Sequence, residues 1–179
     1  MIANDAYFEL NDGRMACIKT TEVSDAKYVL ETIKQCEDET EFIEGCWKSL
    51  TVEDEENYIQ RKIDSDNEYH FSCIVDNKVV GVCSLVINEN KRVAHRCRIG
   101  IIILKEYWGL GIGTEMIKVM KSFARVNKCA QMELSYVEGN IRGLSLYKKT
   151  GFREYGRLPY GIMMSDGSLS DMILMCCLL

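Results

Sequence analysis

Three glycines at alternate positions are the residues of this sequence best suited to holding a ligand. Gly109, Gly111 and Gly113 stand between an apolar run, Ile99 to Leu104, and a segment with helical periodicity. Glycine has no Cβ, so backbone and ligand can approach closely and positive φ is allowed. The first four N–H groups of a helix lack partners, and its dipole is positive there. The segment therefore predicts a strand, a turn and a helix start that binds a phosphate group.

Other interpretations of the same glycines are weighed by their order. No Gly-Lys-Ser/Thr follows them, so this is not a Walker A loop. A dinucleotide fingerprint needs G-x-G-x-x-G, whereas Thr114 stands at the sixth place here. Glu133 has the separation of a ribose-binding acid, but an antiparallel start is the wrong context for that fold. A tight strand-to-helix turn without ligand remains the alternative.

A second group of residues follows the predicted strand Met132 to Val137. Asn140 opens a short helical segment, IRGLSLYKKT, that ends at Gly151. Asparagine is a good N-cap, and glycine suits the left-handed residue after a helix end. A spacing of seven places Asn140 and Tyr147 on one helix face. Tyr147 is then either a proton donor or a tyrosine packed under the sheet.

Taken together, the two segments resemble the GNAT N-acetyltransferase superfamily. Y-W-G-L-G-I-G-T is similar to its acyl-CoA pyrophosphate loop, and E-L-S-Y-V-E-G-N-x-x-G-L-S-L-Y-K-K-T-G-F to its Asn-to-Tyr helix with Gly-Phe. The resemblance is specific from Ile99 to Phe152 and weak before Tyr69. It implies an acetyl-CoA-dependent N-acetyltransferase that acts on a primary amine of a small molecule or protein by direct transfer in a ternary complex. The alternative is a non-catalytic acyl-CoA-binding sensor.

The resemblance also implies roles for individual residues. The N–H groups of Gly109 to Thr114 would bind the CoA pyrophosphate, and Ile101 to Leu104 would pair with the pantetheine arm. The Ile101 N–H would polarise the acetyl carbonyl, Asn140 would touch the pantetheine, and Tyr147 would face the thioester sulfur. The implied acetyl-CoA-binding residues are Ile101, Ile102, Ile103, Leu104, Gly109, Leu110, Gly111, Ile112, Gly113, Thr114, Asn140 and Tyr147. Trp108 departs from the family pattern, which has Gln or Arg there.

The reaction explains why such residues are needed. An amine that attacks a thioester needs a polarised carbonyl, a donor for the oxyanion and a proton for the leaving thiolate. A thiol has a pKa of about 8.5 and a tyrosine about 10, so Tyr147 still carries its proton at neutral pH. Glu133 is the first candidate for the base, through water, against the alternative of a surface-facing strand glutamate. Tyr136 and Glu138 are weaker candidates.

An acidic stretch lies between residues 37 and 56. It holds nine carboxylates against the single Lys48: Glu37, Asp38, Glu39, Glu41, Glu44, Glu53, Asp54, Glu55 and Glu56. Either it is a solvated face with acids in a first helical turn, or it is a rim that attracts a cationic substrate.

Composition limits the class of protein. The chain has 179 residues, 47% hydrophobic and 27% charged, which predicts one globular domain over residues 1–179. A net charge of −5 offers no case for binding nucleic acid. No apolar segment approaches ~18 residues and no signal peptide is recognisable, so we expect a cytoplasmic protein without membrane partners. The nine cysteines are scattered and C-x-x-C is absent, so we expect reduced, buried thiols and no metal site.

The order of the elements predicts a mixed α/β fold. Alternating segments predict a first strand over Arg14 to Thr20 and a hairpin from Tyr69 to Ile87. The resemblance implies a mostly antiparallel sheet of six to seven strands, with helices on both faces and a splayed parallel pair at the centre. The apolar Met172 to Leu179 would be an exposed edge, able to pair with a second copy in a homodimer.

Overall fold

The computed structural model describes residues 5–179. The elements run in the order β1 (Ala6–Glu9), β2 (Met15–Thr20), α1 (Ala26–Glu39), α2 (Val52–Asp64), β3 (Glu68–Val75), β4 (Lys78–Ile87), β5 (Arg96–Ile103), α3 (Ile112–Val126), β6 (Gln131–Val137), α4 (Ile141–Lys149), β7 (Arg153–Met163) and β8 (Leu169–Leu178). The fold is mixed α/β, as predicted, and the described chain forms one sheet.

Within residues 5–179 the sheet has eight strands in the order β1-β2-β3-β4-β5-β6-β8-β7. Only β5 and β6 are parallel, because α3 crosses between them. The resemblance implied six to seven strands, and the difference lies at the N-terminus. The predicted first strand is β2, and the preceding β1 pairs with it through the hairpin loop at residues 10–14.

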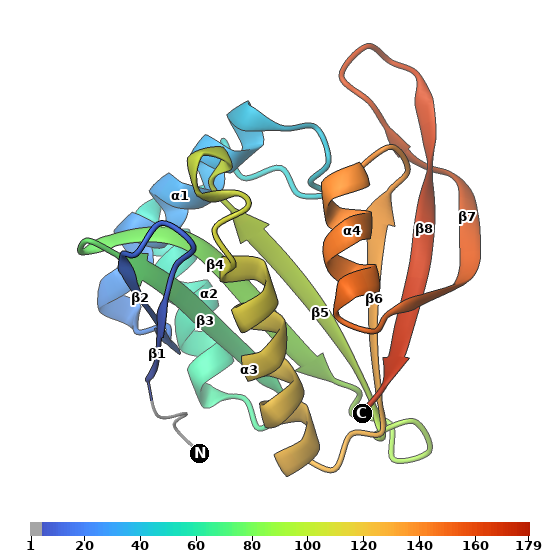
Figure 1. The fold of residues 1–179 in the computed structure, drawn as a ribbon, viewed down its shortest axis with the longest axis horizontal. Helices are drawn as coiled ribbons and strands as arrows, with labels where there is room; N and C mark the ends of the chain where they lie inside the picture. The colour runs from blue at the N-terminus through green and yellow to red at the C-terminus, as the bar shows by residue number, and fades with distance from the viewer. Residues whose placement is uncertain (1–4) are drawn as a thin grey trace.

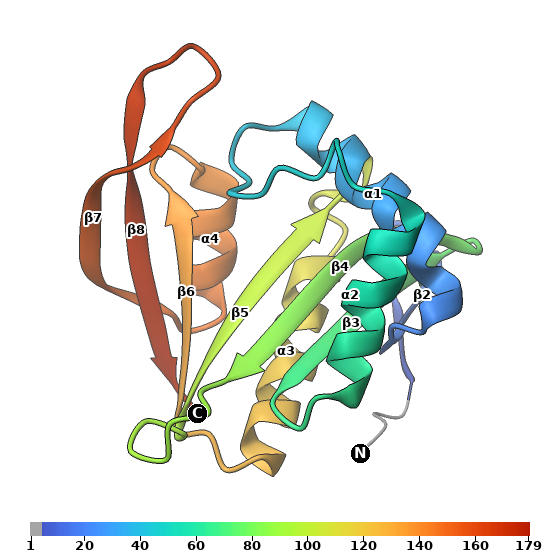
Figure 2. The same ribbon diagram turned by 180° about the vertical axis from the view of Figure 1, so that it is seen from behind.

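The helices cover opposite faces of the sheet, as expected. In Figure 1, α3 and α4 lie in front of the strands, and the reverse view in Figure 2 brings α1 and α2 to the front. Alternation along β4 separates the two cores. Cys83 and Leu85 pack toward Met116 and Met120 of α3 in the larger cluster, whereas Val82 belongs to a second cluster with α1.

Local sequence fixes where several helices begin. Thr51 caps α2, because its hydroxyl accepts a hydrogen bond from the Asp54 N–H and the Asp54 carboxylate accepts one from the Thr51 N–H. These two reciprocal hydrogen bonds form a capping box. Asn140 caps α4 in the same sense, with its Oδ1 accepting from the Gly143 N–H at 2.9 Å.

The last two strands differ from the prediction. β8 lies between β6 and β7, so both of its edges are paired and Met172 to Leu178 is not an exposed edge. The expected exposed edge is therefore wrong, and the homodimer stays a prediction without this strand to support it. The edge strand is β7, which continues past Pro159 because the proline falls in an irregularity between Leu158 and Ile162.

The cysteines follow the prediction. All nine are free thiols, and six are buried: Cys36, Cys73, Cys83, Cys97, Cys129 and Cys177. Burial raises the pKa of the Cys36 and Cys73 thiols to about 12, which keeps them protonated. In residues 5–179 no cluster of His, Cys, Asp or Glu has a metal-binding arrangement, and no helix is long and apolar enough to span a membrane.

Candidate active site

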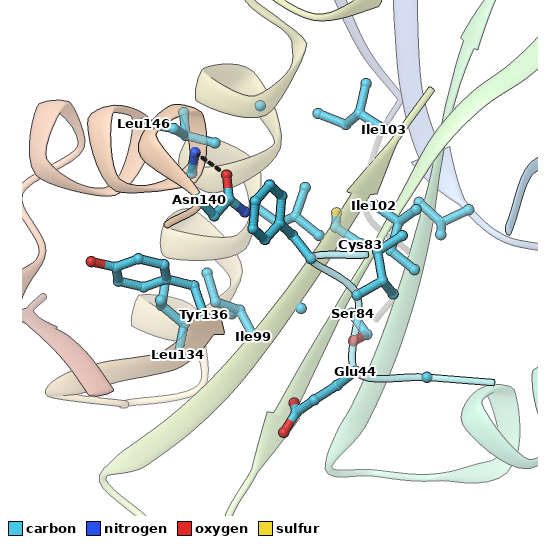
Figure 3. Close-up of a pocket in the computed structure, with 18 of the residues that line it drawn as sticks. Glu44, Cys83, Ser84, Ile99, Ile102, Ile103, Leu134, Tyr136, Asn140 and Leu146 are labelled. Carbon is cyan, nitrogen blue, oxygen red and sulfur yellow. Dashed lines mark hydrogen bonds between the residues drawn. The ribbon is translucent and has the colours of Figure 1, made fainter. Parts of the chain in front are cut away.

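β5 and β6 form a fork at the centre of the sheet. They pair only from Arg96 to Arg98, opposite Gln131 to Glu133, and then diverge. Figure 1 shows the gap widening toward the carboxyl ends of both strands, with α4 beside it. A cavity of about 1060 Å³ occupies this region. Figure 3 shows Leu134 and Tyr136 of β6 on one side of β5 and Ser84 of β4 on the other.

The hydrogen-bond pattern decides which backbone groups face the gap. β4 and β5 keep one register from the pair Gly81–Ile103 to the pair Ile87–Cys97. Just beyond the two ends of this register, the Leu104 N–H donates to the Val80 carbonyl and the Asn88 N–H donates to the Arg96 carbonyl. In an antiparallel pair such bonds recur at alternate residues. Ile102 and Leu104 therefore bond toward β4, while Ile101 and Ile103 point their N–H and C=O groups toward the gap. Of the predicted run, Leu104 is fully buried and does not line the cavity.

The glycine turn has the backbone that the sequence predicts. Gly109 and Gly111 have φ values of 81° and 99°, in the left-handed region that favours glycine. No hydrogen bond within the described chain uses the N–H groups of residues 109–113, whereas Thr114 N–H donates to the Gly111 carbonyl. A Cβ on Gly113 would lie 2.7 Å from Leu146 Cδ2, so glycine lets α3 and α4 pack closely. The turn thus presents consecutive free donors at a helix start.

Only some of the predicted turn residues line the cavity. Gly109, Gly113 and Thr114 line the cavity. Leu110, Gly111 and Ile112 do not line it, and the Ile112 side chain is buried in the core. Only their backbone groups are available for the predicted contact.

Asn11 supports the turn from the N-terminal hairpin. Its side-chain Nδ2 donates to the Gly109 carbonyl at 2.8 Å and its N–H donates to the Leu110 carbonyl at 3.1 Å. No sequence motif suggested this contact.

Asn140 and Tyr147 both line the cavity from α4, as their spacing predicts. The Tyr147 ring packs 5.8 Å from the Tyr136 ring and 6.0 Å from the Phe152 ring, measured between centroids. Burial, with a smaller effect of Tyr136, raises the pKa of the Tyr147 hydroxyl to about 12. The phenol is therefore a neutral hydrogen-bond donor at any physiological pH.

Trp108, the departure from the family pattern, has a structural contact of its own. Its indole N–H donates to the Ile103 carbonyl at 2.7 Å, which occupies one of the polar groups at the open end of the fork. The Arg142 guanidinium lies 5.4 Å from the Trp108 ring and also lines the cavity. A cation thus stands beside the turn on α4, although Trp108 itself brings no charge.

Glu133 is not brought to the cavity. Its carboxylate accepts hydrogen bonds from Arg96 Nε, from Arg96 Nη2 at 2.9 Å and from Gln131 Nε2 at 2.8 Å, where the strands are still paired. It is absent from the cavity lining. The structure therefore offers Glu133 an ion-pair role, and the predicted role as base has no geometric support. Tyr136 lines the cavity, and Glu138 pairs with Arg157.

The cavity also extends to the opposite face of the sheet, under α1 and α2. We call this part the acidic side, made by Glu44, Glu55, His70 and Ser84, and we call the part at Trp108 to Thr114, Asn140 and Tyr147 the glycine side. On the acidic side, His70 is opposite Ser84, which is opposite Gly100, in one row across β3, β4 and β5. The fork joins the two sides.

Several residues of the acidic stretch have structural partners. Glu37 accepts from the Trp47 N–H at 2.9 Å, Glu39 from the Lys105 N–H at 2.7 Å, and Asp38 pairs with Lys48. Asp54 caps α2. The solvated-face interpretation thus holds for part of the stretch, but two members line the cavity.

Those two carboxylates differ in their surroundings. Glu44 is exposed, and its Oε2 lies 3.9 Å from the Arg98 guanidinium. Glu55 is 2% exposed, and its Oε1 has no hydrogen-bond partner in the described chain. Burial raises the pKa of the Glu55 carboxyl to about 7. Sequence alone did not single out Glu55, because it looks like one more acid in a first helical turn.

Comparison with known proteins agrees with this geometry. Residues 32–152 match the model of the Acetyltransferase (GNAT) family. The chain belongs to this acetyltransferase family.

Two solved structures and one curated relative define the likeness further. The GNAT-family acetyltransferase from Streptococcus pneumoniae superposes with a TM-score of 0.85 at 25% identity, covering 92% of this chain and 99% of that one. A putative acetyltransferase from Salmonella typhimurium, solved with its cofactor acetyl-CoA, shares the fold with a TM-score of 0.80 at 14% identity, over 92% and 94% of the chains. A probable spermine N(1)-acetyltransferase of Bacillus subtilis subsp. natto is 37% identical over 57 residues, which span 31% of this chain and 38% of that protein.

Proposed function

We propose that this protein transfers the acetyl group of acetyl-CoA to a primary amine, directly and within a ternary complex. One observation carries the proposal: Ile101 with its free backbone groups, the glycine turn with its unused N–H groups and the Tyr147 side chain all line one cavity. The acetyltransferase family of the chain supports the same reaction class.

The glycine side suits the phosphates and the pantetheine arm. The N–H groups of residues 109–113 would receive the pyrophosphate at the positive end of α3. Arg142 adds a positive charge nearby, which the neutral Trp108 side chain does not provide. The pantetheine amides would then bond to the edge of β5 as an added strand, with the N–H and C=O of Ile101 and the N–H of Ile103 as the backbone groups, since Trp108 already occupies the Ile103 carbonyl. Asn140 would contact the arm from the other wall.

The transfer itself needs three events, and the fork provides groups for two of them. The amine nitrogen forms a bond to the carbonyl carbon, and the Ile101 N–H stabilises the negative charge that develops on oxygen. The carbon–sulfur bond then breaks, and the Tyr147 hydroxyl donates a hydrogen bond to the leaving thiolate. With a pKa of about 12 against about 8.5 for a thiol, Tyr147 keeps its own proton in this role. The proton gained by the thiolate balances one lost by the amine.

The acceptor must lose its ammonium proton to water before the free amine attacks. An amine of ordinary pKa, about 10, is protonated at neutral pH, so the acceptor reaches the cavity as a cation. The exposed Glu44 places negative charge on the acidic side, where the acceptor would enter. The likeness to a protein named a probable spermine N(1)-acetyltransferase also supports a cationic acceptor.

The proposal is tested by measuring CoA release with a thiol reagent across a panel of amines. We expect release with cationic alkylamines, together with a thermal shift on acetyl-CoA alone, because ligand at about 100 times its Kd adds about 2.7 kcal/mol of stability. Stabilisation by acetyl-CoA without release from any amine would instead support the alternative, an acyl-CoA-binding sensor. No stabilisation at all would overturn both.

A further inference from the structure

A buried carboxylate without a partner is the feature of the cavity that the proposed reaction does not use. Glu55 lies in the first turn of α2 and is 2% exposed. Its Oε1 accepts no hydrogen bond from any group in residues 5–179. Burying a charge or a polar atom without a partner is costly, so such groups are paired unless a ligand completes them.

Among the ion pairs that residues 5–179 form, none includes Glu55. On its own helix, Lys62 pairs with Glu68 and lies over the Tyr58 ring, which the Arg61 guanidinium also approaches. From α1, the Lys34 ammonium donates to the Leu50 carbonyl at 2.7 Å. These contacts leave the negative charge of Glu55 uncompensated.

The ring that faces this region from β3 is neutral. Burial and, to a smaller extent, the charge of Lys62 lower the pKa of His70 to about 4. Its Nδ1 shares a hydrogen bond with Thr21 Oγ1 at 3.0 Å, which in turn lies 2.7 Å from Ser72 Oγ. His70 is thus fixed by its own network, and a positive partner for Glu55 must come from outside.

Glu55 differs in this respect from the other carboxylate of the cavity. Glu44 is more than half exposed and lies 3.9 Å from Arg98, so solvent and a cation already compensate its charge. Glu44 suits attraction of a cation to the entrance, whereas Glu55 suits a specific contact with one.

The row across the sheet places this contact away from the reacting atoms. α2 packs on β3, and the Tyr58 ring meets the His70 ring at 5.8 Å. His70 and Gly100 lie opposite the same residue, Ser84, from either side of β4. Two strand spacings make about 10 Å between their backbones. Gly100 precedes Ile101, so the proposed acetyl site lies two strands away from β3, the strand on which the helix of Glu55 packs.

We propose that Glu55 selects the acceptor by binding a second, non-reacting ammonium group of an alkyl diamine or polyamine whose first amine lies at Ile101. This inference rests on the proposed function, because it places the reacting amine at the fork. The apolar walls between the two points, which include Val82 and Ile102, suit the methylene chain that would join the two nitrogens.

A pair of amines separates the second charge from the rest of the acceptor. Butane-1,4-diamine and butylamine have the same carbon chain, and only the diamine carries a second ammonium. We expect the wild-type protein to acetylate the diamine with a kcat/KM at least about tenfold higher than butylamine, since a charge-assisted contact contributes that much or more.

The variant Glu55→Gln removes the charge and keeps the shape. We expect it to lower kcat/KM for the diamine by about ten- to hundredfold, mainly through KM, and to leave butylamine unchanged. Glu55→Asp retains the charge and should restore part of the preference. Glu53→Gln is the matched control, because it removes an exposed carboxylate from the same helical turn and should change neither amine.

Binding of the two amines to the CoA-saturated protein, measured by calorimetry, keeps this test independent of turnover. Tighter binding of the diamine that Glu55→Gln abolishes supports the inference even if no acetyl transfer occurs, and absent transfer then counts against the proposed function alone. Equal binding of diamine and butylamine by the wild type overturns the inference. An equal loss for both amines in Glu55→Gln also overturns it, because Glu55 would then act on the site as a whole.

Discussion

The glycine side and the acidic side of the cavity are built in different ways. On the glycine side, backbone groups of Ile101 and of residues 109–113 make most of the site, and the chain from β5 through α3 provides them in one continuous stretch. On the acidic side, side chains come from α2, β3, β4 and the segment between α1 and α2. A backbone-built site depends on local conformation, whereas a side-chain-built site depends on which distant segments the fold brings together. The first should tolerate side-chain changes and resist backbone changes, and the second should do the reverse.

A change of backbone freedom on the glycine side has the largest expected effect. Gly111→Val places a β-branched residue at φ 99° at the N-terminus of α3. We expect acetyl-CoA affinity to fall roughly a hundredfold or more, because the turn can no longer hold several N–H donors toward the phosphates. Titration calorimetry measures the loss.

The control for this variant is Gly167→Val, which has a similar φ of 83° and open space around it in the β7–β8 turn. It should lose stability without losing acetyl-CoA affinity. Equal affinity of wild type and Gly111→Val would show that the turn does not hold the cofactor.

Removal of one hydroxyl on the glycine side should affect turnover rather than binding. We expect Tyr147→Phe to lower kcat about a hundredfold while the KM for acetyl-CoA changes little, since the donor acts on the leaving thiolate. Steady-state CoA release gives both constants. Tyr136→Phe, whose ring lies 5.8 Å from that of Tyr147, is the control and should retain most activity. An unchanged kcat in Tyr147→Phe would remove the donor role.

On the acidic side, the stability of the protein should depend on pH through Glu55. The folded carboxyl has a pKa of about 7 against 4.5 for an unperturbed one, so between these values the folded state binds more protons than the unfolded state. Stability from this group therefore falls as pH rises from about 4.5 to 7. Glu55→Gln does not titrate, so its Tm advantage over the wild type should grow across that range and level off above pH 7 at roughly 10 °C.

Thermal unfolding of both proteins between pH 4.5 and 8 measures this difference. The lowered pKa of His70 makes stability rise with pH, opposite to the effect of Glu55. Both proteins contain His70, so the difference between their Tm values reports Glu55 alone. Glu53→Gln should show no such pH-dependent gain. A Tm difference that is independent of pH would mean that Glu55 has a partner in the folded protein.

The smallest expected effect is that of a change at Glu133, which lies outside both sides of the cavity. Glu133→Gln should retain turnover within about twofold and lower the Tm slightly, because Glu133 is bound to Arg96 and Gln131 away from the cavity. Steady-state kinetics across pH provide the measurement. A large loss of kcat with a shifted pH profile would restore Glu133 as the base.

The same contrast explains what the sequence could predict. The glycines, Asn140 and Tyr147 lie within one stretch of chain, so their spacing carries geometric information and the resemblance could be recognised. The role of Trp108 as a donor to Ile103 was not predicted, because its partner precedes it in a strand whose open edge is a property of the splayed sheet. The first strand was missed because β1 is only four residues long and has little apolar alternation.

Tertiary pairing decides the features that the sequence could not predict. Met172 to Leu179 is apolar enough for a buried or an exposed strand, and only the insertion of β8 beside β6 settles which. Glu133 and Glu55 look alike in sequence, as acids in regular elements. Arg96, on a neighbouring strand, pairs with Glu133, while the packing of α2 on β3 buries Glu55 without a partner.

The most direct test of this account is acetyl transfer to a defined amine, followed by mass spectrometry. The protein is incubated with acetyl-CoA carrying a ¹³C-labelled acetyl group and with butane-1,4-diamine. We predict singly acetylated diamine containing the label, formed in step with free CoA and strongly reduced in Tyr147→Phe. Stoichiometric binding of acetyl-CoA with no labelled amine, across diamines and monoamines alike, would contradict the account and leave a CoA-binding protein without transfer.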